Sequence, residues 1–247
     1  MPRESGADEP GQVKVGCCGF ALRQAEYFAT FPVIEVQQTF YKPPREATAQ
    51  RWREAAPLDF EFTLKAWQLI THEPTSPTYR KARLRIPDEE RGLYGSFRPT
   101  DEVLAAWEAT RGIAQILRAR VVVFQCPARF TPTDEHVGDL RRFFQRIERG
   151  GLALAWEPRG AWDAGLVRGL CEDLDLVHCV DPFQVEPVAG RLRYFRLHGI
   201  GGYRHKYDDD ELRQLKRWCA RPGPTYCLFN NVAMAEDARR MMAVLGG

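Results

Sequence analysis

Eight short apolar runs that alternate with helical segments constrain the fold of this chain more than any other feature. The runs are rich in β-branched and aromatic residues and are bounded by turn-forming residues, which is typical of strands. They lie at residues 13–19, 33–39, 60–66, 121–125, 152–157, 176–181, 192–199 and 225–230. Apolar residues at helical spacing lie at 22–30, 45–55, 100–117, 133–148, 163–174, 208–219 and 233–245. This alternation predicts an α/β fold, and eight repeats predict a (β/α)8 TIM-type barrel.

A doubly wound parallel sheet is the alternative fold. Dinucleotide-binding sheets of that type carry a G-x-G-x-x-G turn after the first strand, whereas here Gly16 and Gly19 lie too close together to form one. The barrel is therefore the preferred prediction.

Two segments depart from the regular alternation. Residues 67–100, after the third strand, are long for a connection and are rich in basic residues. These are Arg80, Lys81, Arg83, Arg85, Arg91 and Arg98. We expect an Arg-rich insertion, which is either a lid that delivers cations to a ligand or a solvated surface. Only about ten residues join the sixth strand to the seventh, which is short for a crossover helix.

Composition limits the domain organisation and the class of protein. The chain has 247 residues, is 44% hydrophobic and has a net charge of +2, which suits one soluble domain over residues 13–247 after a flexible tail at 1–12. Near-neutral charge argues against a dedicated nucleic-acid coat. The seven cysteines lack C-x-x-C spacing, so neither a disulfide framework nor a zinc ribbon is predicted. With no signal peptide or membrane-spanning run, we expect a cytoplasmic protein without a membrane partner.

Polar residues recur late in the predicted strands. In the seventh strand, Tyr194, Arg196 and His198 share one face, and an unpaired buried charge costs several kcal/mol, roughly. That strand end therefore opens into a polar pocket or joins an ion-pair network. In a parallel barrel the carboxyl ends of all strands meet at one rim, where active sites of this fold lie. We therefore predict a functional site at that rim.

Three residues of this rim are the candidate catalytic groups: Glu157, His198 and Lys65. Glu157 is equally suited to a structural ion pair with Arg159. Lys65 is a candidate base, Schiff-base lysine or anion clamp, or the partner of a salt bridge with Glu35 or Glu157. His198 is a candidate acid or base, a metal ligand or a hydrogen-bonded core histidine.

The remaining rim residues are candidates for substrate binding. They are Arg196, Arg159, Gln125, Glu35, Gln37, Asp181 and Asn230. Guanidinium groups match the oxygens of phosphate and carboxylate. Glu35, Glu157, Asp181 and His198 would also suit a divalent metal, but no H-x-H or H-x-x-E pattern fixes such a site. No metal ligand is assigned, and the cofactor stays open.

Several motifs together resemble one known family. They are Glu35-Val-Gln-Gln-Thr-Phe-Tyr41, Phe62-Thr-Leu-Lys-Ala66 with Thr71-His72, Val123-Phe-Gln-Cys-Pro127 with Phe130, Glu157-Pro-Arg159 with Trp162, Asp181, Tyr194-Phe-Arg-Leu-His-Gly199, Tyr207 and Phe229-Asn-Asn231. From Val13 to about Leu245 the chain resembles the domain of unknown function 72 family, a set of (β/α)8 proteins. The resemblance implies a barrel and no particular reaction. Tyr207 joins the candidate binding residues.

Two departures from the family pattern concern the rim. The family often has a small hydroxyl residue, Gly and an aromatic residue after the first strand, where this chain has Gly16-Cys-Cys-Gly-Phe20. It also often has E-F-R-H where this chain has Glu157-Pro-Arg-Gly160, so one rim histidine is missing. A mechanism that needs two imidazoles is weakened.

Three functions are compatible with these residues. The first is an enzyme (hydrolase, isomerase or lyase) acting on a small anionic substrate, which could be phosphorylated or nucleotide-like. The second is a nucleic-acid-directed, nuclease-like protein, suggested by the basic insertion and by Trp67 and Tyr79, aromatic residues that we expect to be exposed. The third is a non-catalytic scaffold whose rim charges pair among themselves. The enzyme is the preferred hypothesis, and the oligomeric state is not indicated.

Overall fold

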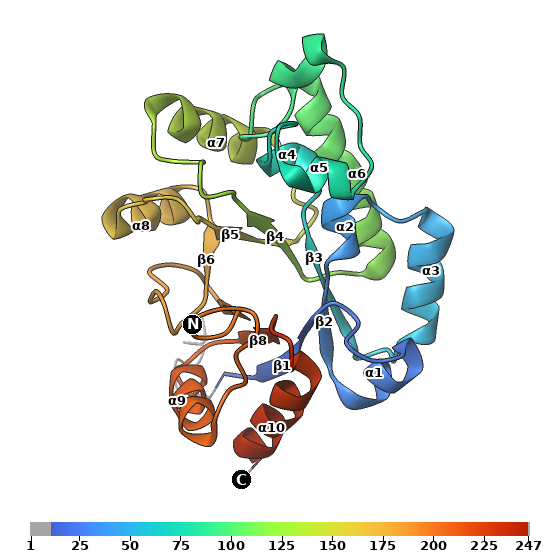
Figure 1. Cartoon of the computed structure of the whole chain (residues 1–247), viewed down its shortest axis with the longest axis vertical. Coiled ribbons are helices and arrows are strands. Elements are labelled where there is room, and N and C mark those ends of the chain that lie inside the picture. The colour runs from blue at the N-terminus through green and yellow to red at the C-terminus, as the bar shows by residue number, and fades with distance from the viewer. Residues whose placement is uncertain (1–10, 247) are drawn as a thin grey trace, which may run out of the picture.

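Eight parallel strands pair in chain order, and β8 pairs with β1 to close the barrel (Figure 1). The computed structural model describes residues 11–246. The strands are β1 (Val13–Cys18), β2 (Val33–Val36), β3 (Glu61–Lys65), β4 (Val121–Gln125), β5 (Ala153–Glu157), β6 (Leu176–Val180), β7 (Arg193–Leu197) and β8 (Thr225–Phe229). The predicted TIM-type barrel is confirmed. Residues 1–10 of the predicted tail lie outside the described residues.

Helices surround the barrel. The longer ones are α1 (Gln24–Thr30), α3 (Glu46–Ala55), α6 (Asp101–Leu117), α7 (Asp134–Arg146), α8 (Ala164–Asp173), α9 (Asp209–Cys219) and α10 (Met234–Gly246). The side chains of Thr100, Thr133, Asp163 and Asp208 cap α6 to α9 by accepting backbone N–H groups of the first turn. No helix among residues 11–246 is long and apolar enough to cross a membrane.

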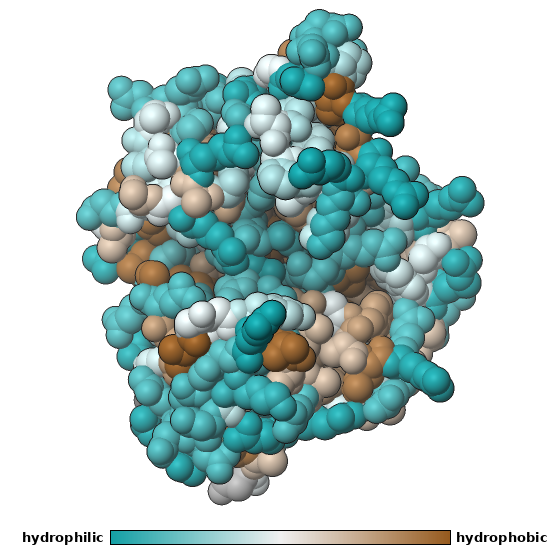
Figure 2. All heavy atoms as spheres, viewed as in Figure 1, coloured by the Kyte–Doolittle hydropathy of each residue, from teal (hydrophilic) through white to brown (hydrophobic). Residues whose placement is uncertain are grey.

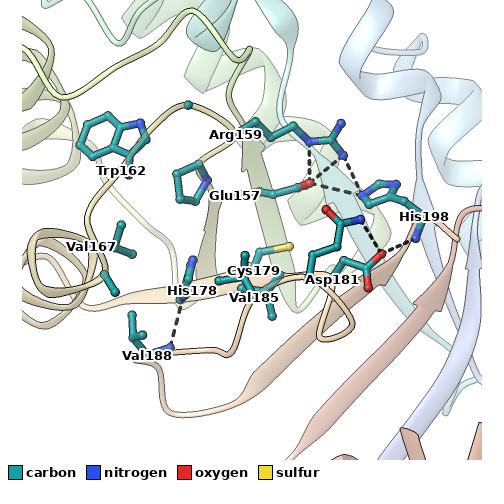
Figure 3. Close-up of a pocket in the computed structure, with 15 residues that line it drawn as sticks. Glu157, Arg159, Trp162, Val167, His178, Cys179, Asp181, Val185, Val188 and His198 are labelled. Carbon is teal, nitrogen blue, oxygen red and sulfur yellow. Dashed lines mark hydrogen bonds and ion pairs between the residues drawn. The ribbon is translucent and has the colours of Figure 1, made fainter. Parts of the chain in front are cut away.

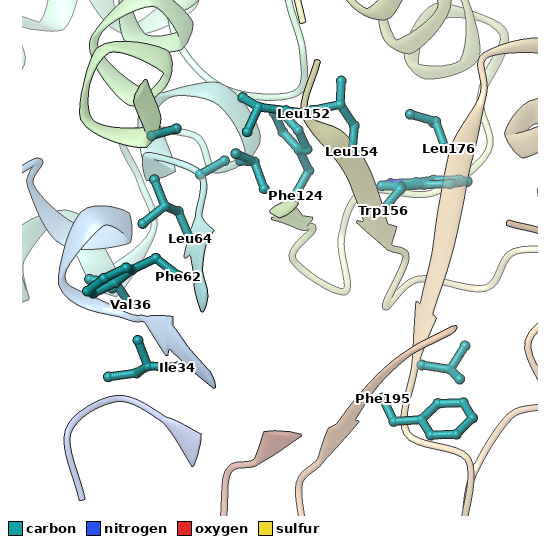
Figure 4. Packing of buried hydrophobic residues seen from close by; sticks show 14 of the residues in the cluster. Ile34, Val36, Phe62, Leu64, Phe124, Leu152, Leu154, Trp156, Leu176 and Phe195 are labelled. Carbon is teal, nitrogen blue, oxygen red and sulfur yellow. The ribbon is translucent and has the colours of Figure 1, made fainter. Parts of the chain in front are cut away.

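The strands separate two apolar cores, because successive side chains point to opposite faces. Side chains that point outward pack against the helices, as Figure 4 shows for Ile34, Phe62, Phe124, Trp156 and Phe195. Side chains that point inward fill the barrel, and they include Val33, Val121, Val123, Ala155, Val177 and Leu228. The interior of the barrel is therefore filled below its carboxyl end.

The amino end of the barrel is closed by polar groups. Lys14 forms an ion pair with Glu61, and the Tyr226 hydroxyl donates to the same carboxylate at 2.6 Å. Lys14, Glu61 and Tyr226 lie in β1, β3 and β8, so their contacts link strands that are far apart in the sequence.

The second strand is shorter than predicted. It ends at Val36, and a helical turn, α2 (Gln38–Tyr41), follows it. Gln37 therefore leaves the strand, and Thr39 lies in α2 with its hydroxyl donating to the carbonyls of Val36 (2.8 Å) and Lys65 (2.6 Å). The extended interpretation of 37–39 was wrong because this local hydrogen bonding replaces strand pairing.

Residues 67–100 contain three short helices, α4 (Gln68–Thr71), α5 (Pro77–Lys81) and the 3-10 helix η1 (Asp88–Leu93). The Tyr79 hydroxyl donates to the carbonyl of His72, and its ring is buried. Tyr79 is thus not the exposed aromatic residue that the nucleic-acid hypothesis used. That this segment is an insertion stays a prediction.

The connection from β6 to β7 contains no helix, in agreement with its short length. The outer face of β6 is therefore covered by α8 and by an irregular loop. Figure 2 shows that hydrophilic side chains cover most of the face seen in this view, with apolar ones in scattered places.

Candidate functional site

Arg196 forms the centre of a buried ion-pair network at the carboxyl end of the barrel. Its Nε donates to both carboxylate oxygens of Glu35, at 3.1 and 3.0 Å, and its Nη2 lies 2.9 Å from Oε1. Its Nη1 donates to Glu157 and, at 3.3 Å, to Gln125. Arg196 is 1% exposed and Glu35 is fully buried. The guanidinium thus links β2, β4, β5 and β7 and has few N–H groups left for a ligand.

The hydrogen-bonding capacity of Glu35 is also used within the protein. The Tyr194 hydroxyl donates to Oε2 at 2.9 Å and lies 2.6 Å from the hydroxyl of Thr63, while the Gln37 amide donates to Oε1. Together with Arg196, these donors make Glu35 an internal counterion. Glu35 therefore lies beneath the opening at the carboxyl end of the barrel, which we call the mouth, and Gln37 bonds to it from a partly exposed position.

Glu157 is a carboxylate under ordinary conditions. Burial raises the pKa of this group, but Arg196, His198 and Arg159 outweigh burial and hold the pKa well below its usual value. The same pairing holds the pKa of Arg196 well above its ordinary value, although burial alone would lower it. A carboxyl group with so low a pKa is a poor carrier of protons near neutral pH.

His198 lies beside Glu157 at the open side of the network. Its Nε2 lies 2.7 Å from Nη2 of Arg159 and 3.3 Å from Oε1 of Glu157, and its Nδ1 lies 3.0 Å from the side-chain amide of Asn230. Arg159 and the Nδ2 group of Asn230 are both donors, so each ring nitrogen is approached by an N–H group, and Nε2 also faces the carboxylate of Glu157. A proton taken up at Nε2 would face the carboxylate of Glu157.

Lys65 does not form the salt bridge with Glu35 or Glu157 that the sequence analysis considered. Its Nζ lies 3.7 Å from the centroid of the Phe40 ring, and it makes no hydrogen bond or ion pair within residues 11–246. Burial lowers the pKa of Lys65 to about 7, and Arg196 adds to this effect while Glu157 and Glu35 oppose it. Near neutral pH a large fraction of this amine is therefore uncharged.

Asp181 and Tyr207 fix loops around the mouth. Asp181 accepts the backbone N–H groups of His198 (2.9 Å) and Phe183 (3.1 Å), and burial raises its pKa. The Tyr207 hydroxyl accepts the N–H of Gly199 at 2.9 Å. Both residues thus hold the segment that carries His198, and Asp181 also faces the cavity described next.

A cavity of about 390 Å³ opens beside this network (Figure 3). Glu157, Arg159, Asp181 and His198 line one part of it, and Arg159, His198 and Asn230 also border a neighbouring hollow under the 199–203 loop. The Arg159 side chain is 38% exposed, and although it bonds Glu157 and His198, its Nη1 makes no hydrogen bond within the described part of the chain. A small ligand therefore has access to one guanidinium group, the imidazole and a carboxylate.

The four residues considered for a metal are not arranged as a metal site. Arg196 lies between Glu35 and Glu157, and both oxygens of Asp181 accept hydrogen bonds. Within residues 11–246, no group of three or more His, Cys, Asp or Glu side chains is placed to hold an ion. No step below depends on a metal.

The cysteine thiols are buried, as expected for packing residues. Burial raises the pKa of Cys17 to about 12 and that of Cys18 well above its ordinary value. Neither of these two thiols, which lie in β1, is therefore suited to act as a nucleophile.

Gly160 explains one departure from the family pattern. A Cβ atom at this position would lie 2.5 Å from the carbonyl oxygen of Phe130 and 3.0 Å from that of Ala128. A histidine here would require the 128–130 segment to shift. The close backbone packing at this position thus accommodates glycine and leaves no room for a histidine side chain.

Sequence reasoning missed two residues near the mouth. Phe40 contacts Lys65, and it was missed because the strand was extended past its true end. His178 lines the cavity from β6, and it was missed because it lies in an apolar run without a neighbouring polar residue. The sequence signal that could have identified His178 was a polar imidazole on a strand face that is otherwise apolar.

Comparisons with known proteins agree with the observed fold. A family model described as protein of unknown function DUF72 matches residues 21–247. A DUF72 family protein from Enterococcus faecalis V583 is 20% identical over 96% of this chain and 98% of its own, with a TM-score of 0.72. One from Thermotoga maritima MSB8 is 20% identical over 95% and 99%, with a TM-score of 0.69. No curated protein matches the chain.

A more distant structure shares the architecture alone. D-psicose 3-epimerase, solved in the presence of D-fructose, is 16% identical over 95% of this chain and 100% of its own, with a TM-score of 0.54. Likeness at this level of identity concerns the barrel and not the chemistry.

Proposed function

Because the chain belongs to the DUF72 family of proteins of unknown function, its activity has to be inferred from the site, and we propose that it is an enzyme. It acts on a small anionic substrate by acid–base chemistry at the carboxyl end of the barrel. The observation that carries this proposal is the buried amine of Lys65, which has no ion-pair partner among residues 11–246 and whose pKa responds to the charges of Arg196 and Glu157. A scaffold would gain stability by pairing or removing such a group.

Lys65 and His198 exchange protons with the substrate in this proposal. A group transfers protons best when its pKa lies near the working pH, which the pKa of Lys65 at about 7 satisfies. His198 lines the cavity with Nε2 at 3.3 Å from Oε1 of Glu157, which orients the imidazole toward the substrate in this proposal. Removal of a proton next to a carbonyl group, a step shared by isomerases and lyases, needs such a base and acid. Hydrolysis remains an alternative use of the same pair.

Arg159 binds the anionic group of the substrate, because its guanidinium reaches the cavity and has N–H groups to spare. Arg196 has a different role from the direct contact first considered, since Glu35, Glu157 and Gln125 occupy its donors. We assign it as a positioning residue that fixes the orientation and charge of Glu157.

The test is a turnover screen with Lys65→Met as the key variant. Pools of sugar phosphates, hydroxy acids and nucleotides are incubated with the protein and followed by NMR. For a substrate found in this way, Lys65→Met and His198→Gln are each expected to lower kcat by about 10²–10⁴-fold. In the wild type, log(kcat/KM) is expected to bend near the pKa of Lys65.

The matched control is Lys42→Met, which makes the same substitution at an exposed position. It is expected to leave turnover unchanged. Full activity in both Lys65→Met and His198→Gln would contradict the proposal, as would the absence of turnover for all three substrate classes.

A nucleic-acid-directed function is the second candidate. Arg80, Arg83 and Arg85 line a hollow of about 540 Å³ beside α5, and none of them forms an ion pair within the part of the chain that the structure describes. If this surface binds phosphates, retention of single-stranded DNA in a gel shift weakens steeply with salt, and the triple alanine variant abolishes it. No retention at low ionic strength removes this candidate.

A further inference from the structure

The cavity at the mouth has a second end that the proposed chemistry does not use. It extends outward past β6, between α8 and the 182–191 loop, to Trp162, Val167, His178 and Val188. In Figure 3 these side chains lie on the opposite side of the space from Arg159 and His198. The space lies where an irregular loop, and not a helix, connects β6 to β7.

His178 presents a single defined donor to this end of the cavity. The backbone N–H of Val188 donates to Nδ1 at 3.3 Å, so the ring proton of the neutral imidazole lies on Nε2. His178 is 5% exposed, and burial lowers its pKa to about 4, so it is neutral at neutral pH. Nε2 makes no hydrogen bond within residues 11–246, and Figure 3 shows it directed toward the side of Glu157 and Trp162.

The walls around His178 are apolar. Val167 and Val180 are buried, and Val188 and the ring of Trp162 are partly buried. The Trp162 indole N–H already donates to the Phe130 carbonyl at 2.7 Å, so this residue offers an apolar surface to the cavity. An unpartnered donor between apolar walls fits a flat ring that carries one acceptor, because burial of that donor without a partner is costly.

We propose that the outer end of this cavity binds a planar apolar ring with a hydrogen-bond acceptor, which belongs to the same substrate whose anionic group is held at Arg159. This inference rests on the proposed function and narrows its substrate class to anions that carry an aromatic or heteroaromatic ring. The cavity of about 390 Å³ is within the range of small-molecule sites, roughly 300–1,000 Å³.

Three probes separate the two ends of the cavity: acetate, benzoate and nicotinate. Benzoate adds a ring to the carboxylate, and nicotinate adds an acceptor to that ring. By titration calorimetry at pH 7.5, benzoate is expected to bind about tenfold more tightly than acetate because of the buried ring. Nicotinate is expected to bind about fivefold more tightly than benzoate because of the added hydrogen bond.

Two variants assign these differences to the outer end. In His178→Asn the amide oxygen keeps an acceptor near Val188, but the shorter side chain withdraws its N–H donor from the position of Nε2, so the preference for nicotinate over benzoate is expected to vanish. Val167→Trp fills the space and is expected to reduce both ring-bearing probes to the affinity of acetate. Leu58→Trp, at an exposed position, is the control and leaves all three affinities unchanged. Cooperative thermal unfolding establishes that each variant is folded.

The inference is overturned if benzoate binds no more tightly than acetate, or if the nicotinate preference is absent from the wild type or survives in His178→Asn. Failure of the proposed function gives a different result. In that case the three probes bind in the expected order, while Lys65→Met and the wild type show the same lack of turnover.

Discussion

Replacement of Arg196 by Met is expected to lower the free energy of unfolding at pH 7 by about 3–5 kcal/mol, as for other buried ion pairs that lose one partner. Glu35 and Glu157 would remain buried without the cation that both now contact. Denaturation by urea, followed by circular dichroism, measures the loss. Arg239→Met is the control, because Arg239 pairs with Glu26 at the surface, where such pairs contribute about 0–1 kcal/mol.

The pH dependence of the same variant tests the cause of the loss. The pKa of Glu157 is depressed in the folded wild type, so its stabilising contribution is present above its unfolded pKa and is lost as pH falls through the folded value. Without Arg196 this contribution disappears, and the carboxyl group takes up a proton more readily. The difference in stability between wild type and variant is therefore expected to shrink as the pH is lowered from 7 toward 4. If Arg196→Met lowers the free energy of unfolding at pH 7 by less than about 1 kcal/mol, its ion pairs contribute no more than surface pairs do, which contradicts the prediction.

The barrel was predictable because its signal is repeated. Each strand places apolar residues on its outward face, and the inward polar residue near its end stands out against them, as with Glu35, Glu157 and Arg196. Parallel pairing then brings these ends together whatever the lengths of the connections. The sequence could therefore indicate which residues converge without indicating what they contact.

Partners at the mouth were less predictable, because they depend on a few ångströms of side-chain placement. Lys65 was a candidate for pairing with either glutamate, but Arg196 occupies the space between them and Lys65 packs on Phe40 instead. Phe40 itself was hidden by the wrong end assigned to β2. His178 became visible as a lining residue only once the helix-free β6–β7 connection was placed in space.

The structural and the functional interpretations of the rim charges apply to different residues. Arg196 and Glu35 are buried and nearly saturated with hydrogen bonds, which is what a structural network requires. Arg159 and His198 face the cavity, and Lys65 has no partner among the described residues. The network therefore supports the groups that we propose to be functional, and the two sets respond to substitution in opposite ways.

Lys65→Met is accordingly expected to raise the free energy of unfolding at pH 7, by about 3–5 kcal/mol from the change in pKa at 1.36 kcal/mol per unit. The folded pKa of about 7 lies below the ordinary value of 10.5. Between pH 7 and pH 10.5 the unfolded chain therefore holds the proton of Lys65, while the folded chain releases it. Methionine has a similar length and keeps the contact with Phe40 without a charge to bury.

The pH profile of this gain distinguishes the buried amine from a general effect of an apolar side chain. Between pH 7 and 10.5 the unfolded wild type binds more protons at Lys65 than the folded protein, so wild-type stability from this group rises with pH. The advantage of Lys65→Met is thus full below pH 7, declines through this window and disappears above it. Urea denaturation at pH 6.5, 8 and 9.5 measures the decline, and Lys42→Met, at an exposed position, should show none. A destabilised Lys65→Met would mean that the amine is paired in solution, and the assignment of Lys65 as an acid–base group would fail with it.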